Sequence, residues 1–299
     1  MLLYDPSAHF AQRVFDQATG LRQMNQQNPV QVIAVASGKG GVGKTNVSVN
    51  LSLALSMLRR KTLLMDADLG LANVDLLLGL RAKKNLSHVI TGEVPLRDIV
   101  IEGPSGLHVI PASSGTQMMA ELNPAQHAGL IQAFSDLHMP LDTLMVDTAA
   151  GISDNVVSFS KAAHEVIVVV CDEPTSLTDA YALIKVLSTE HGVNRFHVLA
   201  NSVSSPQEGM DLFSKLSLVT GKYLDVSLEF LGAVPFDNYL RQSVKKQQAV
   251  ILSYPRSPSA IAFKKIAEKV NRWQTPTEAR GQLEFFIERL IQNMDSAGA

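Results

Sequence analysis

The chain has 299 residues, of which 46% are apolar and 18% charged, so it can bury a large core in one or two domains. A net charge of −2 gives no bulk attraction to nucleic acid, and a single cysteine, Cys171, excludes an internal disulfide. No Cys/His cluster has zinc-site spacing, and no apolar run approaches the ~20 residues that span a bilayer. The first residues lack a basic region followed by an apolar one, so we expect that they are not a signal peptide. We therefore expect a cytoplasmic protein whose contact with a membrane is peripheral.

Residues 5–24 are predicted to form an amphipathic helix. Asp5 can cap it, Pro6 suits its first turn, and four apolar side chains share one stripe: Phe10, Val14, Ala18 and Leu21. A polar linker, residues 25–29, precedes the first predicted strand. Residues 1–28 are therefore predicted to be an N-terminal helix and linker outside the main domain.

Residues 29–274 are predicted to form one doubly wound α/β domain, with a mainly parallel sheet of about seven or eight strands flanked by helices. Short apolar or β-branched runs alternate there with segments of helical period. The runs lack polar alternation, which is typical of strands buried on both faces. They are Gln31–Ser37, 62–66, 107–111, 144–147, 166–171, 197–201 and 228–234.

A phosphate-loop motif, G-x-x-x-x-G-K-T, lies between the first predicted strand and the next predicted helix. Its glycines let backbone N–H groups curl around an anion, and the helix N-terminus adds partial positive charge. Lys44 would reach the β and γ phosphates, and Thr45 would place its hydroxyl on Mg²⁺. The predicted nucleotide-binding residues here are Gly38, Lys39, Gly40, Gly41, Val42, Gly43, Lys44, Thr45 and Asn46; a glycine-rich turn is the competing interpretation.

Lys39 follows the first glycine of this loop and gives the pattern K-G-G-x-G-K-T. The loop resembles that of the deviant Walker A ATPases of the MinD/ParA group, over roughly residues 30–270. In that group the lysine matching Lys39 reaches across a dimer to the partner's phosphates. The resemblance thus implies a homodimer that forms when ATP is bound; the alternative for Lys39 is a solvated loop lysine.

Asp66 and Asp68 end the second predicted strand, beside the phosphate loop. Mg²⁺ keeps several waters, so a nearby carboxylate can act through one of them. The resemblance to the family pattern D-x-D-x-x-x-x-N implies that Asp66 joins the Mg²⁺ water shell, Asp68 positions the attacking water and Asn73 belongs to switch I. Hydrolysis would then depend on orientation and on charge neutralisation by Lys39, Lys44 and Mg²⁺. A turn-capping role is the alternative for Asp68.

The strand ending at Asp147 continues into Thr-Ala-Ala-Gly, which resembles the family's Walker B and switch II segment, usually D-x-P-A-G. The resemblance implies that Asp147 holds a Mg²⁺-bound water and that Gly151 lets the loop move when the γ phosphate leaves. Ala149 replaces the usual proline, so switch II should be slightly less constrained.

Asn201 is followed by Ser-Val-Ser, and not by the N-K-x-D pattern with which a protein reads guanine. The absent lysine and aspartate favour ATP, and the resemblance places Asn201, Pro235, Phe236 and Asp237 on the adenine side. Residues 171–179 resemble the family's segment near the dimer interface or form an ordinary capped helix start.

Three other branches of the fold are disfavoured. One cysteine cannot supply the two thiolates per subunit of the iron-protein branch. The late basic residues are predicted to be a solvated helix face, so no direct nucleic-acid contact is expected; they are Arg256, Lys264, Lys265, Lys269 and Arg272. Nothing suggests the second substrate pocket of a metabolic ligase.

The segment 16–22, Asp-Gln-Ala-Thr-Gly-Leu-Arg, resembles the D-Q-A-x-x-L-R motif of the flagellar number regulators of the FlhG/FleN group. This implies a slow regulatory ATPase, with ATP and Mg²⁺ as cofactors, that controls flagellar number or placement. Its N-terminal helix would activate FlhF, a GTPase of the signal-recognition-particle class, through Asp16, Gln17, Ala18, Leu21 and Arg22. Flagellar transcription regulators and basal-body proteins are further partner classes. The alternatives are a cell-division MinD, a DNA-partitioning ParA, or a helix that only packs on the core.

Residues 275–299 are predicted to carry a last amphipathic helix, after the break at Thr-Pro-Thr. Apolar side chains recur there at helical spacing: Leu283, Phe286, Ile287, Leu290 and Ile291. This stripe favours reversible contact with the inner face of the cell membrane, for example at the cell pole. It equally suits a groove on its own domain or on a partner.

Overall fold

A computed structural model describes residues 29–68, 73–112, 124–137, 139–274 and 287. The predicted N-terminal segment and all of the predicted C-terminal helix except Ile287 lie outside these ranges, so the proposed division into three segments stays a prediction.

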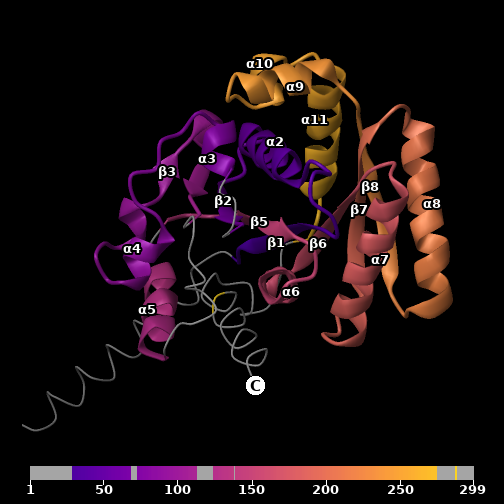
Figure 1. The fold of residues 1–299 in the computed structure, drawn as a ribbon. Coiled ribbons are helices and arrows are strands. Elements are labelled where there is room, and N and C mark those ends of the chain that lie inside the picture. Colours follow the sequence, from indigo (N-terminus) through magenta and orange to yellow (C-terminus); the bar gives the residue numbers. More distant parts are fainter. Residues whose placement is uncertain (1–28, 69–72, 113–123, 138, 275–286, 288–299) are drawn as a thin grey trace, which may run out of the picture.

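The described residues form an eight-stranded sheet of order β3-β4-β2-β5-β1-β6-β7-β8 (Figure 1). Its strands are β1 (Gln31–Ser37), β2 (Thr62–Ala67), β3 (Ile101–Glu102), β4 (His108–Ile110), β5 (Thr143–Ala150), β6 (Glu165–Val170), β7 (Arg195–Val203) and β8 (Ser227–Pro235). Every neighbouring pair is parallel except β3 and β4. The predicted doubly wound, mainly parallel fold is thus confirmed.

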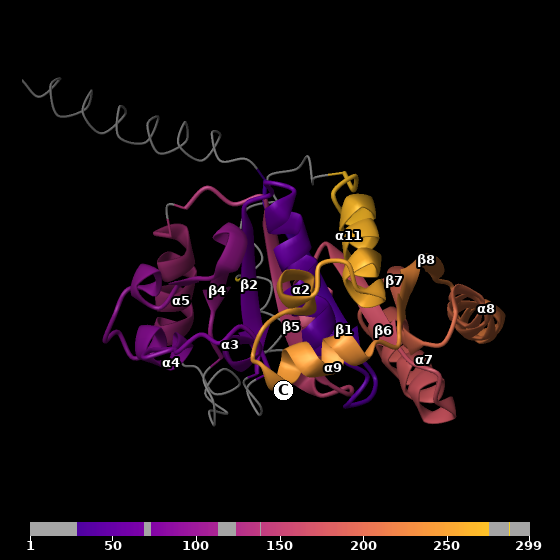
Figure 2. The same ribbon diagram turned by 90° about the horizontal axis from the view of Figure 1, so that it is seen from above.

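Helices cover both faces of the sheet (Figures 1 and 2). They are α2 (Lys44–Met57), α3 (Val74–Leu77), α4 (Leu86–Ile90), α5 (Pro124–Ser135), α6 (Asp154–Ala162), α7 (Pro174–Thr189), α8 (Pro206–Tyr223), α9 (Asn238–Lys245), α10 (Val250–Ser253) and α11 (Pro258–Val270), with short 3-10 turns at Leu96–Asp98 and Pro104–Gly106. One face packs on α2, α10 and α11, and the other packs on α4 to α8. Each central strand is therefore buried on both sides, which explains its continuous apolar sequence.

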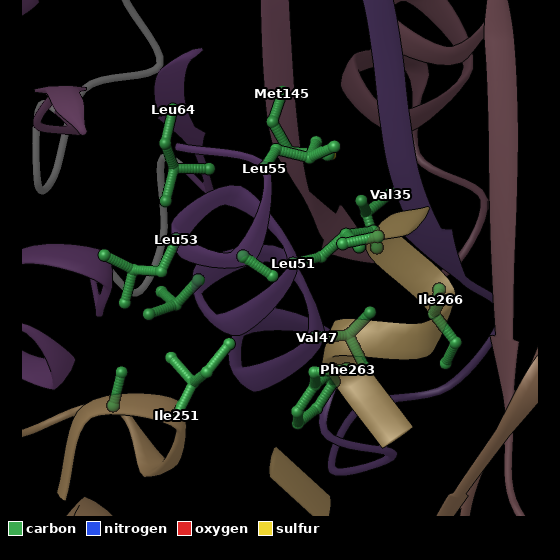
Figure 3. Close-up of a cluster of buried hydrophobic side chains, with 14 of the residues drawn as sticks. Val35, Val47, Leu51, Leu53, Leu55, Leu64, Met145, Ile251, Phe263 and Ile266 are labelled. Atoms are coloured by element: carbon green, nitrogen blue, oxygen red, sulfur yellow. The ribbon is translucent and has the colours of Figure 1, made fainter. Parts of the chain in front are cut away.

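The core beneath α2 and α11 shows how alternate strand residues serve opposite faces. Val35 of β1 and Met145 of β5 meet Leu51 of α2 and Phe263 of α11 in one cluster (Figure 3). Val32 of β1 instead belongs to the cluster on the opposite face. Each fully buried side chain of this kind contributes about 1.5–3 kcal/mol, so the sheet is a rigid platform for the loops at its edges.

Within the described ranges, no helix has both the length and the apolar content needed to cross a bilayer.

Candidate nucleotide site

The phosphate loop connects the carboxyl end of β1 to α2, and glycines are required at both of its ends. A Cβ on Gly38 would lie 2.2 Å from the backbone C and O atoms of Asp179, in α7. Gly43 has φ +88°, and a Cβ there would lie 2.3 Å from Nδ2 of Asn201. The loop is thus confined between α7 and the end of β7.

A cavity of about 560 Å³ opens over this loop at the carboxyl edge of the sheet. Its lining includes several predicted phosphate-site residues: Lys39, Gly40, Gly41, Gly43, Lys44, Thr45, Asn46, Asp68 and Asn73. The lining also includes residues that sequence reasoning did not identify as part of the site: Ser37, Ala150, Leu76 and Leu77 of α3, and Val244 and Gln247 near the end of α9. The structure thus brings the two predicted lysines and Asp68 to one cavity.

Asp147 is fully buried beside Lys44 of the loop, and only one of its carboxylate oxygens is bonded. Its Oδ1 accepts from Lys44 Nζ at 2.9 Å and from Ser48 Oγ at 2.7 Å. Its Oδ2 is buried and has no hydrogen-bond partner among the described residues. A buried carboxylate oxygen in this condition costs free energy until a cation or a polar group reaches it.

Asp66 lies beside Asp147, because the two residues are paired across β2 and β5. Its Oδ1 accepts from the N–H of Asp68, and its Oδ2 accepts from the N–H groups of Asn73 and Val74. Burial raises the pKa of Asp66 to about 7, and the neighbouring Asp147 carboxylate adds to the rise. Two ionised carboxylates side by side repel each other, and a nearby positive charge would stabilise both in the ionised form.

These residues fit a Mg²⁺ ion. Asp147 Oδ2 lacks a partner among the described residues, Asp66 is paired with Asp147 across the two strands, and Thr45 lines the cavity. Mg²⁺ is commonly bound through one or two carboxylates together with water and phosphate oxygens, so three protein groups suffice. The predicted metal set of Thr45, Asp66 and Asp147 is consistent with this arrangement and stays a prediction.

Lys39 has partners within its own chain. Its Nζ is bonded to Glu173 Oε2 and donates to Thr175 Oγ1 at 3.0 Å. The hydrogen bond to Glu173 raises the pKa of Lys39. Both partners precede or begin α7, within the segment that sequence analysis associated with a dimer interface.

A second cavity of about 550 Å³ adjoins the other side of the loop and has the predicted adenine-side residues in its lining: Asn201, Pro235, Phe236 and Asp237. Asn201 Nδ2 donates to the carbonyl of Val42 at 2.7 Å, so this side chain joins the base side to the phosphate loop. Phe236 is exposed, and the Arg241 guanidinium lies 5.4 Å from its ring centre.

Asp237 lines this cavity, but the fold uses both of its carboxylate oxygens. Oδ1 caps α9 by accepting from the N–H of Tyr239, and Oδ2 accepts from the N–H and the hydroxyl of Ser259. A direct contact between nucleotide and Asp237 stays a prediction, while its structural role in holding α9 and α11 is evident.

The predicted switch residues lie beside the loop. Gly151 has φ +97°, a conformation that suits glycine, and its N–H donates to the carbonyl of Ser37 at 2.8 Å. The N–H of Asn73 is bonded to Asp66. Ala149, which replaces the usual proline, packs against the buried cluster of α7 and α8.

Three predicted features lie away from the cavity: the partner-binding motif, the membrane stripe and the late basic residues. The partner-binding motif at 16–22 and four of the five membrane-stripe residues lie outside the described ranges. Ile287, the fifth, is 1% exposed and packs with Phe134, Leu144 and Phe159. In this structure that side chain is therefore docked on its own domain. Two of the late basic residues, Lys264 and Lys269, donate to backbone carbonyls of Pro255 and Leu231.

Ser48 is the buried site residue that sequence analysis missed. It lies one helical turn after Lys44 on α2, so helix periodicity places both on one face. That spacing was visible in the sequence, but the partner, Asp147, is 99 positions away.

The ParA family, described as "NUBPL iron-transfer P-loop NTPase", matches residues 28–271. The chain is 59% identical to the antiactivator FleN of Pseudomonas aeruginosa over 93% of this chain and 100% of that protein. It is 34% identical to the flagellum site-determining protein YlxH of Helicobacter pylori, over 90% of this chain and 95% of that protein.

Solved structures agree with these matches. The septum site-determining protein MinD from Pyrococcus horikoshii, in complex with Mg-ADP, superposes with a TM-score of 0.66 at 25% identity, over 81% of this chain and 96% of that chain. A chain of the MinC:MinD cell division protein complex of Aquifex aeolicus gives the same TM-score at 25% identity, over 83% of this chain and 98% of that chain. The loop geometry, the sheet order and these matches together show that the chain belongs to the ParA/MinD family of P-loop NTPases.

Proposed function

We propose that this chain is an ATPase whose ATP-dependent dimerisation controls flagellar number or placement. The observation that carries the proposal is 59% identity along the full length of the antiactivator FleN. A second relative, YlxH, is named as a flagellum site-determining protein. Identity to the MinD of Synechocystis is lower, at 29% over 251 residues, so division-site selection has less support.

The proposed chemistry is phosphoryl transfer to water, which requires positioning and charge neutralisation more than covalent catalysis. Lys44 would leave Asp147 to bind the β and γ phosphates, and loop N–H groups would hold the same oxygens. Asp68, at the cavity wall, would orient the attacking water. Bound Mg²⁺ would supply charge neutralisation and ordered water, held by Thr45, Asp66 and Asp147.

Lys39 supports the proposed dimerisation. It lines the phosphate cavity, and its side chain and that of its partner Glu173 are both partly exposed. Leu76 of α3, which lines the same cavity, is exposed, and so is Ile152, which follows β5. Exposed apolar groups beside a charged cleft are suited to burial against a second copy. The ATP-bound dimer would place each Lys39 on the phosphates of its partner.

Two contacts with other components complete the proposal. The 16–22 motif would activate an FlhF-type GTPase. The relative's name, antiactivator, supports an activator protein as another partner, and we propose a flagellar transcription regulator for this role. The C-terminal stripe would bind the membrane reversibly after Ile287 leaves its buried position. Iron transfer is not proposed, because Cys171 is the chain's single cysteine.

Complementation tests the proposal. In a Pseudomonas aeruginosa strain without FleN, this chain should restore the normal number of flagella, counted by electron microscopy. The Lys44→Ala variant should not restore it, whereas Lys61→Ala, an exposed lysine outside the cavity, should. A parent chain that leaves the flagellar count unchanged would refute the flagellar assignment, and full rescue by Lys44→Ala would refute its dependence on nucleotide.

A further inference from the structure

Ser48 occupies a buried position between the phosphate loop and the Asp147 carboxylate. It is 0% exposed, on the face of α2 that also carries Lys44. Its Oγ lies 2.7 Å from Asp147 Oδ1 and 3.2 Å from the backbone carbonyl of Lys44. A hydroxyl has one hydrogen, so it can donate fully to only one of these acceptors. The shorter contact to a charged oxygen is the stronger bond, which assigns the hydrogen to Asp147.

The two donors on Asp147 Oδ1 are not equivalent. Lys44 is the residue that the phosphate-loop motif assigns to nucleotide phosphates, so its ammonium group has a second destination. Ser48 has none, because it is neutral, short and enclosed by the core. Once Lys44 moves to phosphate, Ser48 is the donor that still fixes Oδ1.

We propose that Ser48 is a positioning residue for the metal: it holds the Asp147 carboxylate so that the unpartnered Oδ2 faces the Mg²⁺ position in the nucleotide-bound state. The proposal deepens the proposed function and rests on it, because it assumes a Mg²⁺-nucleotide complex. Without the Ser48 hydroxyl, the carboxylate could rotate about its terminal bond, since such torsions have broad minima. Both oxygens would then sample positions unsuitable for the metal.

The chain offers a matched control on the same helix. Ser52 lies one turn further along α2 and is also 0% exposed, but its Oγ has no hydrogen-bond partner among the described residues. Ser48→Ala and Ser52→Ala therefore remove the same atom from equally buried positions. Only the first removes a bond to Asp147.

The experiment is a Mg²⁺ titration of the binding of a fluorescent ATP analogue to the full-length protein. Ser48→Ala should raise the Mg²⁺ concentration at half-maximal binding about tenfold, as expected for a lost hydrogen bond to a charged group. Nucleotide affinity in excess EDTA should stay within about twofold of the parent, because the phosphate loop itself is unchanged. Ser52→Ala should match the parent in both measurements, because its hydroxyl has no bond to Asp147.

Several outcomes would overturn the inference. These are a Mg²⁺ requirement of Ser48→Ala equal to that of the parent, and an equal increase in Ser52→Ala. If Ser48→Ala does not fold, Ser48→Cys takes its place: it keeps the side-chain shape but donates weakly, so a parent-like Mg²⁺ requirement would also refute the proposal. A parent that binds the analogue equally with and without Mg²⁺ would refute the proposed Mg²⁺-ATP site as well, which distinguishes that failure from failure at Ser48 alone.

Discussion

Lys39 has its ammonium group engaged within its own chain, although the family resemblance assigns it to a partner's phosphates. Its contacts are Glu173 and Thr175, and about a third of the lysine side chain and half of the glutamate side chain are exposed. Ion pairs with this exposure contribute little, because water and salt screen them. A nucleotide phosphate on a second copy could therefore displace Glu173 at small cost.

The first prediction concerns this exchange of partners. Lys39→Ala should remain monomeric with ATP, because the charge that joins the subunits is gone. Glu173→Gln should dimerise at an ATP concentration about two- to fivefold lower than the parent, the range that loss of an exposed ion pair allows. Size-exclusion chromatography with light scattering measures both. Glu190→Gln, an exposed residue at the end of α7, is the control. An ATP-dependent dimer of Lys39→Ala would remove Lys39 from the interface.

Asp68 lines the phosphate cavity near Lys39 and Lys44, which is where an attacking water would have to be oriented. We predict that Asp68→Ala still binds ATP and dimerises but releases phosphate on the order of 10²-fold more slowly, the lower range for loss of a group that directs proton transfer. Asp98→Ala, in an exposed 3-10 turn, should keep the parent rate. Equal turnover by Asp68→Ala and the parent would support the turn-capping interpretation instead.

At the scale of residues, the sequence was sufficient to predict site residues that belong to a known motif. The spacing of Lys39, Lys44 and Asp68 predicted a shared site, and one cavity holds all three. Ser48 and Glu173 could not be found in this way, because their roles depend on partners that are 99 and 134 positions away. Serine on a helix has many ordinary uses, so Ser48 did not stand out. Glu173 lies in the segment 171–179 that the resemblance associates with a dimer interface, but its bond to Lys39 was not predicted.

At the scale of elements, Asp237 at the start of α9 was predicted to bind nucleotide, and in the structure it stabilises the fold. Asp237 caps α9 through Tyr239 and is bonded to Ser259 at the start of α11. Burial alone would raise the pKa of Asp237, but the hydrogen bonds from Ser259 and Tyr239 outweigh it, and the pKa is lowered. The ionised carboxylate thus joins two helices near the nucleotide cavities.

Asp237→Ala is predicted to lower the free energy of unfolding by about 2 kcal/mol, since a helix cap and hydrogen bonds to a charged group are lost together. Because the folded pKa lies below the unfolded value, this stabilisation is complete above the unfolded pKa of about 4 and is lost as pH falls through the folded pKa. Urea unfolding at pH 7 and at pH 3 measures it, with Asp225→Ala as an exposed control. A difference from the parent that is the same at both pH values would contradict the assignment to the ionised carboxylate.

The sequence predicted strands wherever both faces are buried. All seven predicted runs overlap strands of the sheet, and β1 has the predicted bounds. The eighth strand, β3, was missed because it has two residues, is partly exposed and pairs antiparallel at the edge. Such a strand has too few residues for a periodic pattern, so it is recognised only by its pairing with β4 in the structure.

For the whole molecule, Ile287 relates the predicted C-terminal helix to the core. It is 1% exposed and lies in the cluster with Phe134 and Phe159, while the nucleotide cavity opens at the carboxyl edge of the sheet. A residue buried on its own domain cannot insert into a bilayer at the same time. Membrane binding through the apolar stripe therefore requires that Ile287 leave the cluster. Docking on its own domain and binding to the membrane can then be two states of the same switch.

We predict that the parent sediments with anionic liposomes in the presence of ATP and that Phe286→Glu does not, because a carboxylate on the apolar stripe is costly to bury. Phe286 lies outside the described residues. Glu288→Gln, at a charged residue outside the apolar stripe, should keep liposome binding and serves as the control. Unchanged sedimentation of Phe286→Glu would show that the stripe docks on protein and not on lipid.

The last prediction treats the N-terminal segment, also outside the described residues, as a separable effector. The sheet begins at Gln31, and the linker 25–29 precedes it, so deleting residues 1–24 should leave ATP binding and dimerisation intact. The same deletion should abolish stimulation of an FlhF-type GTPase, because Gln17 and Arg22 are the polar groups of the motif that can reach another protein's nucleotide site.

A peptide of residues 1–24 should stimulate that GTPase alone, though weakly, since a short helix must be ordered on binding. The full-length Arg22→Ala variant tests the motif without removing the rest of the segment. It should dimerise normally and stimulate the GTPase only slightly. GTP turnover measured with the parent, the deletion, the peptide and this variant provides the comparison. Full stimulation by the deleted protein would mean that the segment only packs on the core, and the proposed contact with FlhF would then lose its basis.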